Sequence, residues 1–183
     1  MAPALVLIDL QNDYFPGGDM ELVGADTAVL NAARLLTRFR QRSLSVFHIQ
    51  HIETDEQAPF FRSGTQGVEI HPAVSPVAGE PVIVKRFPNS FRDTALLESL
   101  RAAGITDLCF AGMMTHMCVD STVRAAVDLG FNCTVAEDAC ATTHLRLGPS
   151  EVNAHAVQLA YMAALNEGIA SVQAVDAVLA TLG

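Results

Sequence analysis

Short apolar segments alternate with amphipathic ones along this chain, and the alternation constrains the fold more than any other feature. The apolar segments are rich in Val, Ile, Leu or Ala, as expected for strands that are covered on both faces. They are Ala4–Leu10, Leu44–Gln50, Pro81–Lys85, Leu108–Ala111, Cys133–Glu137 and Ala170–Val175. The predicted helices are Ala25–Gln41, Asp93–Ala103, Thr115–Leu129, Ser150–Glu167 and Asp176–Leu182. Strands that alternate with helices predict an α/β fold, a mostly parallel sheet with helices on both faces.

Residues at the ends of these segments support the boundaries. Asp93 and Ser150 are predicted N-caps, because their side chains can accept hydrogen bonds from the first free N–H groups of a helix. Gly104, Gly130 and Gly168 are predicted C-terminal stops. The stretch from residue 51 to 79 shows neither the helical nor the strand periodicity of apolar residues, and it contains several prolines and glycines. It is therefore predicted to be a long loop, and such loops in compact domains tend to be functional.

Composition narrows the class of protein further. A chain of 183 residues predicts one domain, residues 1–183, and no apolar run is long enough to span a bilayer. The net charge of -9 argues against nucleic acids and anionic membrane surfaces as partners. The N-terminus lacks the basic region of a signal peptide, and the four cysteines show no C-x-x-C pair or zinc spacing. Reduced thiols in the cytoplasm are the simplest interpretation.

Cys118 is the strongest candidate for a reactive side chain. It follows the predicted strand Leu108–Ala111 and a break at Gly112, so it falls in the first turn of a predicted helix. Free N–H groups and the positive end of the helix dipole favour a thiolate there, and they can also hold an oxyanion. Free cysteines are often only small buried residues. The rest of the site therefore has to distinguish packing from catalysis.

Asp9 and Lys85 are the predicted partners of Cys118. Each lies at the end of an apolar strand, and parallel strands bring their carboxyl ends to one edge of the sheet. There Asp9 would accept the thiol proton, return it to a leaving amine and activate water, while Lys85 would lower the pKa of Cys118. A strand-end aspartate can also be a turn residue, and a strand-end lysine a solvated charge. Catalysis is favoured because an unpaired charge is costly beside segments built for burial.

At these positions the chain resembles the isochorismatase-like cysteine hydrolase superfamily, which includes nicotinamidases and N-carbamoylsarcosine amidohydrolase. The matching pieces are LIDLQNDYF at 7–15, SGTQGVEIHP at 63–72, VKRFPNSF at 84–91 and GMMTHMCVDSTVRAA at 112–126. The resemblance covers nearly the whole chain and implies a triad of Asp9, Lys85 and Cys118 on a six-stranded parallel sheet of a three-layer αβα fold. It also implies a cis peptide bond between Met113 and Met114, with the N–H groups of Met114 and Cys118 forming the oxyanion hole.

The chain departs from the nicotinamidase pattern where those relatives bind a metal. The Asp-x-His after the second strand and the histidine before Ser-Gly-Thr are replaced here by His51, Glu53 and Phe60. An apolar ring cannot serve as a ligand, so we expect no metal and no cofactor. A residual site at His51 and Glu53 is the alternative, but His51 is better interpreted as a pocket residue. Nicotinamide is accordingly not expected to be the substrate.

The pocket itself is predicted to be apolar and adaptable. Its candidate substrate-binding residues are Tyr14, Phe15, His51, Phe60, Met113 and His116, with Phe61 and Met117 nearby. Arg86 and Arg124 are candidates to hold a substrate carboxylate, although Arg124 lies two turns into its helix and suits a structural role.

The sequence therefore predicts a cytoplasmic, cofactor-free amidohydrolase that cleaves a linear C–N bond of a small molecule through a thioester on Cys118. The bond could be an amide, carbamoyl or ureido bond. One alternative is a vinyl-ether or ester hydrolase that uses Asp9 without covalent catalysis. Another is a catalytically silent binding subunit. Homo-oligomerisation is expected, with the Ala-rich segment Ala154–Ala164 as a packing surface.

Overall fold

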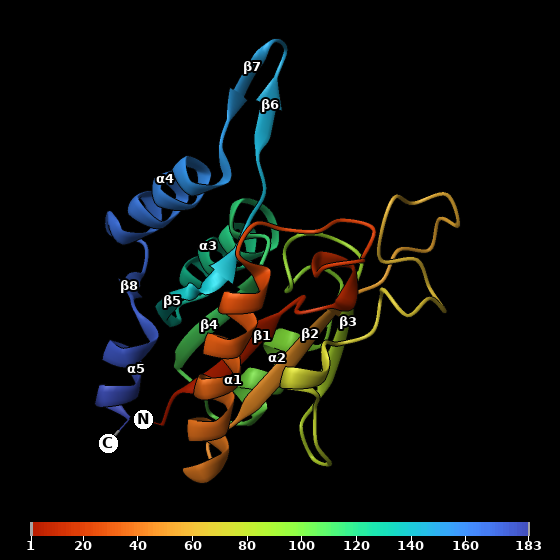
Figure 1. Ribbon diagram of the computed structural model, residues 1–183. Helices are drawn as coiled ribbons and strands as arrows, with labels where there is room; N and C mark the ends of the chain where they lie inside the picture. The colour runs from red at the N-terminus through yellow and green to blue at the C-terminus, as the bar shows by residue number, and fades with distance from the viewer. Residues whose placement is uncertain (1, 183) are drawn as a thin grey trace.

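The computed structural model describes residues 2–182, and its centre is a parallel sheet of six strands in the order β3-β2-β1-β4-β5-β8. The strands are β1 Ala4–Ile8, β2 Val46–His51, β3 Val82–Lys85, β4 Asp107–Met113, β5 Asn132–Ala141 and β8 Ser171–Gln173. The helices are α1 Ala25–Gln41, α2 Leu96–Ala102, α3 Asp120–Asp128, α4 Ala154–Asn166 and α5 Val175–Thr181. Short helical turns are η1 Asn12–Tyr14, η2 Pro72–Val74 and η3 Thr115–Val119. The three-layer fold expected from the sequence is confirmed (Figure 1).

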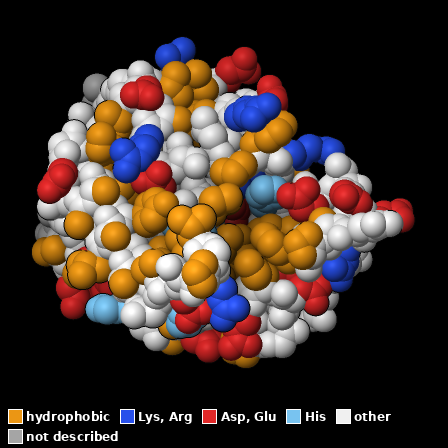
Figure 2. All heavy atoms as spheres, turned by 90° about the horizontal axis from the view of Figure 1, so that it is seen from above, with side chains coloured by type: hydrophobic (Ala, Val, Ile, Leu, Met, Phe, Trp, Pro, Cys, Tyr) orange, Lys and Arg blue, Asp and Glu red, His pale blue; other side chains and the backbone are white. Residues whose placement is uncertain are grey.

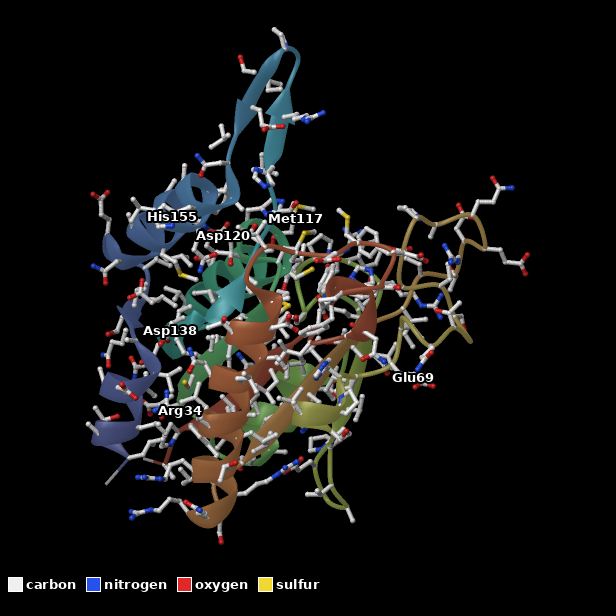
Figure 3. All side chains as sticks on the ribbon, viewed as in Figure 1. Arg34, Glu69, Met117, Asp120, Asp138 and His155 are labelled. Carbon is white, nitrogen blue, oxygen red and sulfur yellow. The ribbon has the colours of Figure 1, made fainter. Side chains whose placement is uncertain are left out.

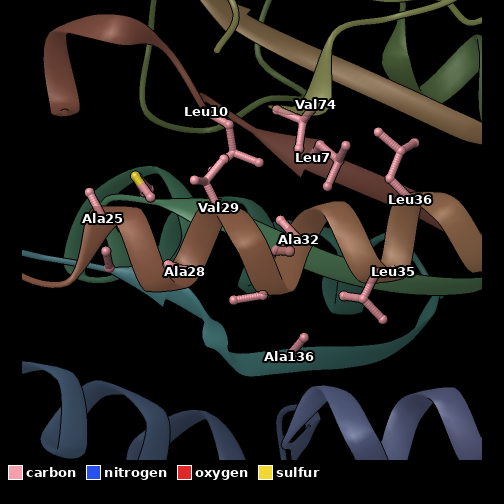
Figure 4. Close-up of a cluster of buried hydrophobic side chains, with 14 of the residues drawn as sticks. Leu7, Leu10, Ala25, Ala28, Val29, Ala32, Leu35, Leu36, Val74 and Ala136 are labelled. Atoms are coloured by element: carbon pink, nitrogen blue, oxygen red, sulfur yellow. The ribbon is translucent and has the colours of Figure 1, made fainter. Parts of the chain in front are cut away.

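Two apolar clusters fill the space on either side of the sheet. Successive side chains of a strand point to opposite faces, so β1 contributes to both clusters. Leu5 and Leu7 pack with α1 and α5, whereas Val6 and Ile8 pack with α2, α3 and α4. Figure 4 shows α1 lying along the first cluster, with Val29 directed toward β1. Burial on both faces explains why the strand segments read as continuous apolar runs.

The carboxyl ends of β1, β2, β3 and β4 meet at one edge of the sheet, and Gly112 controls how closely two of them approach there. Its φ is 145°, and an added Cβ would lie 2.0 Å from the carbonyl oxygen of Ile8. A side chain at this position would therefore force β4 away from β1. The peptide bond that joins Met113 to Met114, just beyond, is cis.

Two predicted helix starts are wrong. Ser150 does not cap a helix, since it belongs to a hairpin of β6 Leu145–Leu147 and β7 Ser150–Val152 that projects from the body (Figure 1). Asn153 caps α4 instead, and its side chain accepts a hydrogen bond from the Ala156 N–H at 2.9 Å. Asp93 has a φ of 55°, and α2 begins only at Leu96.

The predicted helix from Thr115 to Leu129 has two parts. It opens with the wide turn η3 and continues as α3. Among residues 2–182, none of the helices combines the length and apolar character that crossing a bilayer requires.

Candidate active site

The ends of three strands, β1, β3 and β4, deliver the predicted triad to the carboxyl edge of the sheet. Asp9 follows β1 with a φ of 50°, Lys85 is the last residue of β3, and Cys118 lies in η3 after β4. Lys85 pairs in register with His51 on β2, so its side chain reaches past β2 toward Asp9. The convergence depends on the parallel topology, because these residues are far apart in the sequence.

The three side chains are in contact and almost closed off from solvent. Lys85 Nζ lies 2.8 Å from Asp9 Oδ2 and 3.1 Å from Cys118 Sγ. Asp9, Lys85 and Cys118 are 0%, 1% and 4% exposed. Within the described residues, Asp9 Oδ1 has no hydrogen-bond partner. A buried carboxylate with an unused oxygen beside a thiol is placed to accept that thiol's proton.

The charges of the site oppose one expectation from the sequence. The pKa of Cys118 is raised, first by burial and next by the Asp9 carboxylate, and the Lys85 ammonium offsets this only in part. Burial works against the charge of Lys85, but Asp9 and Cys118 outweigh it and the lysine pKa is raised. The resting site is therefore a neutral thiol beside an Asp9–Lys85 ion pair. Lys85 lowers the pKa of Cys118, as expected from the sequence, but burial and the Asp9 carboxylate together raise this pKa by more.

His51 completes the cluster, and it bears on the question of a metal. One ligand atom each of Asp9, His51 and Cys118 lies within 4.8 Å of the others. The Lys85 ammonium, however, contacts all three, with Nζ 3.1 Å from His51 Nδ1. A divalent ion at this point would face a buried positive charge, so the cluster does not fit a metal ion.

The turn around the nucleophile is held by backbone hydrogen bonds. The carbonyl of Met114 accepts from the N–H groups of Met117 and Val119, at 3.1 and 3.2 Å. Met114 itself is 7% exposed and directly precedes η3, the turn that contains Cys118. The predicted oxyanion donors, the N–H groups of Met114 and Cys118, therefore belong to one short, fixed segment.

Two aromatic rings from the long loop, those of Phe60 and Phe61, pack on Tyr14. Tyr14 lies 4.6 Å from the Phe61 ring and 5.8 Å from the Phe60 ring, measured between centroids. Burial is the main cause of the raised pKa of Tyr14, and the titratable groups of Cys118, Asp9 and Asp13 raise it further. Hydrophobic side chains gather over the face of the molecule seen in Figure 2.

Met117 directly precedes Cys118 in η3. Met117 is 41% exposed and lies above the carboxyl ends of the strands (Figure 3).

The other predicted pocket residues make contacts with other parts of the protein. Phe15 packs on the His71 ring at 4.1 Å, and Met113 is fully buried in the cluster that faces α1. His116 is half-buried, with Nδ1 2.6 Å from the Thr142 hydroxyl.

The two arginines considered for a substrate carboxylate also differ from one another. Arg124 contacts both carboxylate oxygens of Asp120 at 3.0 Å, so its charge is already paired. Arg86 has an exposed side chain.

Two buried side chains that the sequence reasoning missed hold the site together. The amide of Gln11 bonds the N–H and the carbonyl of His51, both at 2.8 Å. Asp13 Oδ2 accepts from the Phe61 N–H at 2.6 Å and so fixes the aromatic loop. An added Cβ at Gly67 would lie 1.9 Å from the carboxylate of Asp13. The only sequence signal was their place in the segment 7–15, since their partners lie 40 residues or more away.

A buried thiol, ammonium and carboxylate at the carboxyl edge of a parallel three-layer sheet define the class of α/β cysteine hydrolases. The isochorismatase domain model matches residues 3–174, and the chain belongs to the isochorismatase family. The isochorismatase family protein YddQ of Bacillus subtilis is 50% identical over 98% of this chain and 99% of its own length.

Two further relatives agree with this assignment. A solved isochorismatase-type hydrolase from Oleispira antarctica is 47% identical with a TM-score of 0.95, over 98% of this chain and 96% of that one. The maleamate amidohydrolase of Pseudomonas putida is 30% identical, over 82% of this chain and 76% of its own length. The protein is a hydrolase of the isochorismatase family.

Proposed function

We propose that this protein is a cysteine-dependent amidohydrolase that cleaves a linear amide, carbamoyl or ureido C–N bond of a small molecule. The supporting observation is the contact of Lys85 Nζ with both Cys118 Sγ and Asp9 Oδ2, beside an Asp9 oxygen that has no other partner among the described residues. A nucleophile, a proton acceptor and a charge-balancing cation are the groups that acyl transfer requires.

The reaction begins as the Cys118 thiol transfers its proton to Asp9 and Sγ attacks the carbonyl carbon. The carbonyl π electrons move to the oxygen, and the N–H groups of Met114 and Cys118 hold the resulting oxyanion. When the oxyanion collapses, the C–N bond breaks and the amine leaves with the proton from Asp9. A thioester remains on Cys118.

Hydrolysis of the thioester restores the site. Water attacks the acyl carbon while Asp9 accepts one of its protons, and collapse breaks the C–S bond to release the carboxylic acid. Cys118 then regains its proton from Asp9. Lys85 stays positively charged throughout, and the negative charge that it stabilises moves between Asp9 and Cys118.

The surroundings of the triad favour an acyl group without a carboxylate next to the scissile bond. Tyr14, Phe60 and Phe61 are aromatic, and Arg124 is already paired with Asp120. The relative named a maleamate amidohydrolase supports a C–N bond as the target. No cofactor is needed for these steps. Four free cysteines, all buried, suit the reduced thiols of the cytoplasm, which is the proposed location.

Release of ammonia or amine from a panel of small amides, ureas and carbamoyl compounds tests the proposal. Cys118→Ala is expected to reduce turnover about 10³-fold or more, because the covalent route is lost. Cys133→Ala, a buried cysteine at the far end of the sheet, is the matched control and should keep wild-type turnover. Circular dichroism melting checks that both variants fold.

A p-nitrophenyl acetate experiment separates the covalent route from its alternative. This ester has a leaving group that needs no proton, so Asp9→Asn should form the thioester and then stall. Mass spectrometry is expected to find one acetyl group on Cys118. Turnover that survives in Cys118→Ala, with no adduct in Asp9→Asn, would instead support vinyl-ether or ester hydrolysis by Asp9 alone. A protein that neither turns over nor acylates is the silent binding subunit.

A further inference from the structure

The Lys85 ammonium has more acceptors than protons. Its Nζ lies 2.8 Å from Asp9 Oδ2 and 3.1 Å from each of His51 Nδ1, the Phe87 carbonyl oxygen and Cys118 Sγ. An ammonium group carries three N–H donors and no acceptor. Two of the four neighbours, His51 and Phe87, are uncharged and take no part in the proposed chemistry. They can hold the ammonium while Asp9 and Cys118 exchange a proton.

The contact with Lys85 fixes the tautomer of His51. An ammonium can only donate, so Nδ1 of His51 must be the acceptor and the ring proton must be on Nε2. Nε2 lies 3.0 Å from Glu53 Oε1, which accepts that proton in a hydrogen bond. The two hydrogen bonds therefore run in one direction, from the Lys85 ammonium to His51 and from His51 to the anchoring carboxylate of Glu53.

The backbone of His51 is fixed as well. Gln11, fully buried, bonds both the N–H and the carbonyl of His51 at 2.8 Å. His51 also pairs in register with Lys85 across β2 and β3. The ring nitrogen that faces the ammonium is consequently carried by a rigid strand and not by a loop.

We propose that His51 is a positioning residue: in its neutral form, with the ring proton held on Nε2 by Glu53, it fixes the Lys85 ammonium between Asp9 and Cys118. This inference rests on the proposed function and adds to it a residue that does not touch the reacting atoms.

The protonation of His51 gives the inference a distinct signature. The titratable groups that face it are Lys85, Asp9, Cys118 and Glu53. Burial lowers its pKa most and Lys85 lowers it further, against the opposing effects of Asp9 and Glu53. When the ring does protonate at acid pH, Nδ1 is lost as an acceptor and a second cation stands 3.1 Å from Lys85. Reactivity of Cys118 should fall as this occurs.

Glu53→Gln tests this pH dependence, because the direction in which it should shift the pKa of His51 is known. Glu53 raises the pKa of His51, so its removal lowers that pKa further, while glutamine can still accept the Nε2 proton. Below the pKa of Cys118 the rate of its alkylation by iodoacetamide, followed by mass spectrometry, falls about tenfold per pH unit through the ionisation of the thiol itself. The additional fall that accompanies protonation of His51 should move to lower pH in Glu53→Gln. An additional fall at the wild-type pH would overturn the inference.

Substitution of His51 supplies the second readout. His51→Leu should slow the alkylation of Cys118 at neutral pH by about 10- to 100-fold, the effect of losing one hydrogen bond to a charged group. His51→Asn should recover much of the rate, because its side-chain oxygen can accept where Nδ1 does. His155→Asn, at an exposed histidine on α4, is the matched control and should react as wild type. Equal rates in His51→Leu and wild type would overturn the inference.

A measurement on the unaltered protein avoids any doubt about folding. Nitrogen-15 NMR of the six histidine rings, with His51 identified from its absence in His51→Asn, is expected to show a neutral ring protonated on Nε2 at pH 7. A ring protonated on Nδ1, or on both nitrogens, would overturn the inference. The alkylation rates and the NMR spectra do not depend on turnover. The amidohydrolase proposal is tested by turnover in Cys118→Ala, so its failure can be told apart from a failure of this inference.

Discussion

Asp9 and Cys118 compete for one proton beside a lysine that keeps its charge. Burial and the Asp9 carboxylate raise the pKa of Cys118, so the proton rests on sulfur and the negative charge on Asp9. Two negative charges in this closed space would leave one without its own cation. The nucleophile is therefore made only as the proton moves, and a reactive thiolate does not accumulate between turnovers.

Asp9→Asn should separate the ionisation of Cys118 from catalysis. Removing the carboxylate removes a cause of the raised Cys118 pKa and leaves the thiolate as the anionic partner of Lys85. Alkylation by iodoacetamide at neutral pH should become faster than in wild type, while amide hydrolysis is lost with the proton carrier. The contrary change is expected in Lys85→Met, in which the cation is absent. An Asp9→Asn protein with slower alkylation would contradict the shared-proton description.

At the level of the elements, one carboxylate ties α1, β2 and the start of β3 together. Glu80 Oε1 lies 2.7 Å from Arg40 Nε on α1, and Oε2 lies 2.8 Å from His48 Nε2 on β2. The hydrogen bond from Arg40 is the main reason that the pKa of Glu80 falls from its usual 4.5 to about 2. This cluster lies just before β3, the strand that carries Lys85.

Glu80→Gln is expected to lower the free energy of unfolding by about 1–2 kcal/mol at pH 7, because a charge-assisted pair that is partly open to solvent is lost. A carboxylate with a lowered pKa stabilises the fold above its usual pKa, and this contribution disappears as pH falls from 4.5 toward about 2. Urea unfolding across that range should show the two proteins converging at the acid end. Glu56→Gln, in the exposed part of the loop, should match wild type at every pH.

The chain as a unit presents apolar side chains to solvent on its projecting hairpin and on α4. Leu147, Val152 and Leu159 are 86%, 48% and 63% exposed, and a hairpin of two strands is marginal by itself. We propose that a second copy of this chain covers them in a homo-oligomer. Light scattering is expected to give a multiple of 19.5 kDa, and Leu147→Ser with Leu159→Ser should shift the mass toward the monomer. A monomer mass for the wild-type protein at all concentrations would refute the assembly.

The sequence alone determined the fold class and the residues that meet at the sheet edge. Strands buried on both faces need continuous apolar runs, and parallel strands align their carboxyl ends, so Asp9, Lys85 and Cys118 could be placed without coordinates. The residues at which helices begin and end were harder to predict from the sequence. Ser150 and Asn153 are both suitable caps, and only the pairing of β6 with β7 selects Asn153.

The tertiary structure decided the charges and the supporting contacts. The pKa of Cys118 depends on its burial and on its distances to Asp9 and Lys85. Neither can be predicted from the residues next to Cys118 in the sequence. His51 faces the Lys85 ammonium only because β2 lies between β1 and β3, and Gln11 reaches its backbone from 40 residues away. Periodicity and strand ends are local properties of a chain. Electrostatics and hydrogen bonding between distant segments exist only once the chain has folded.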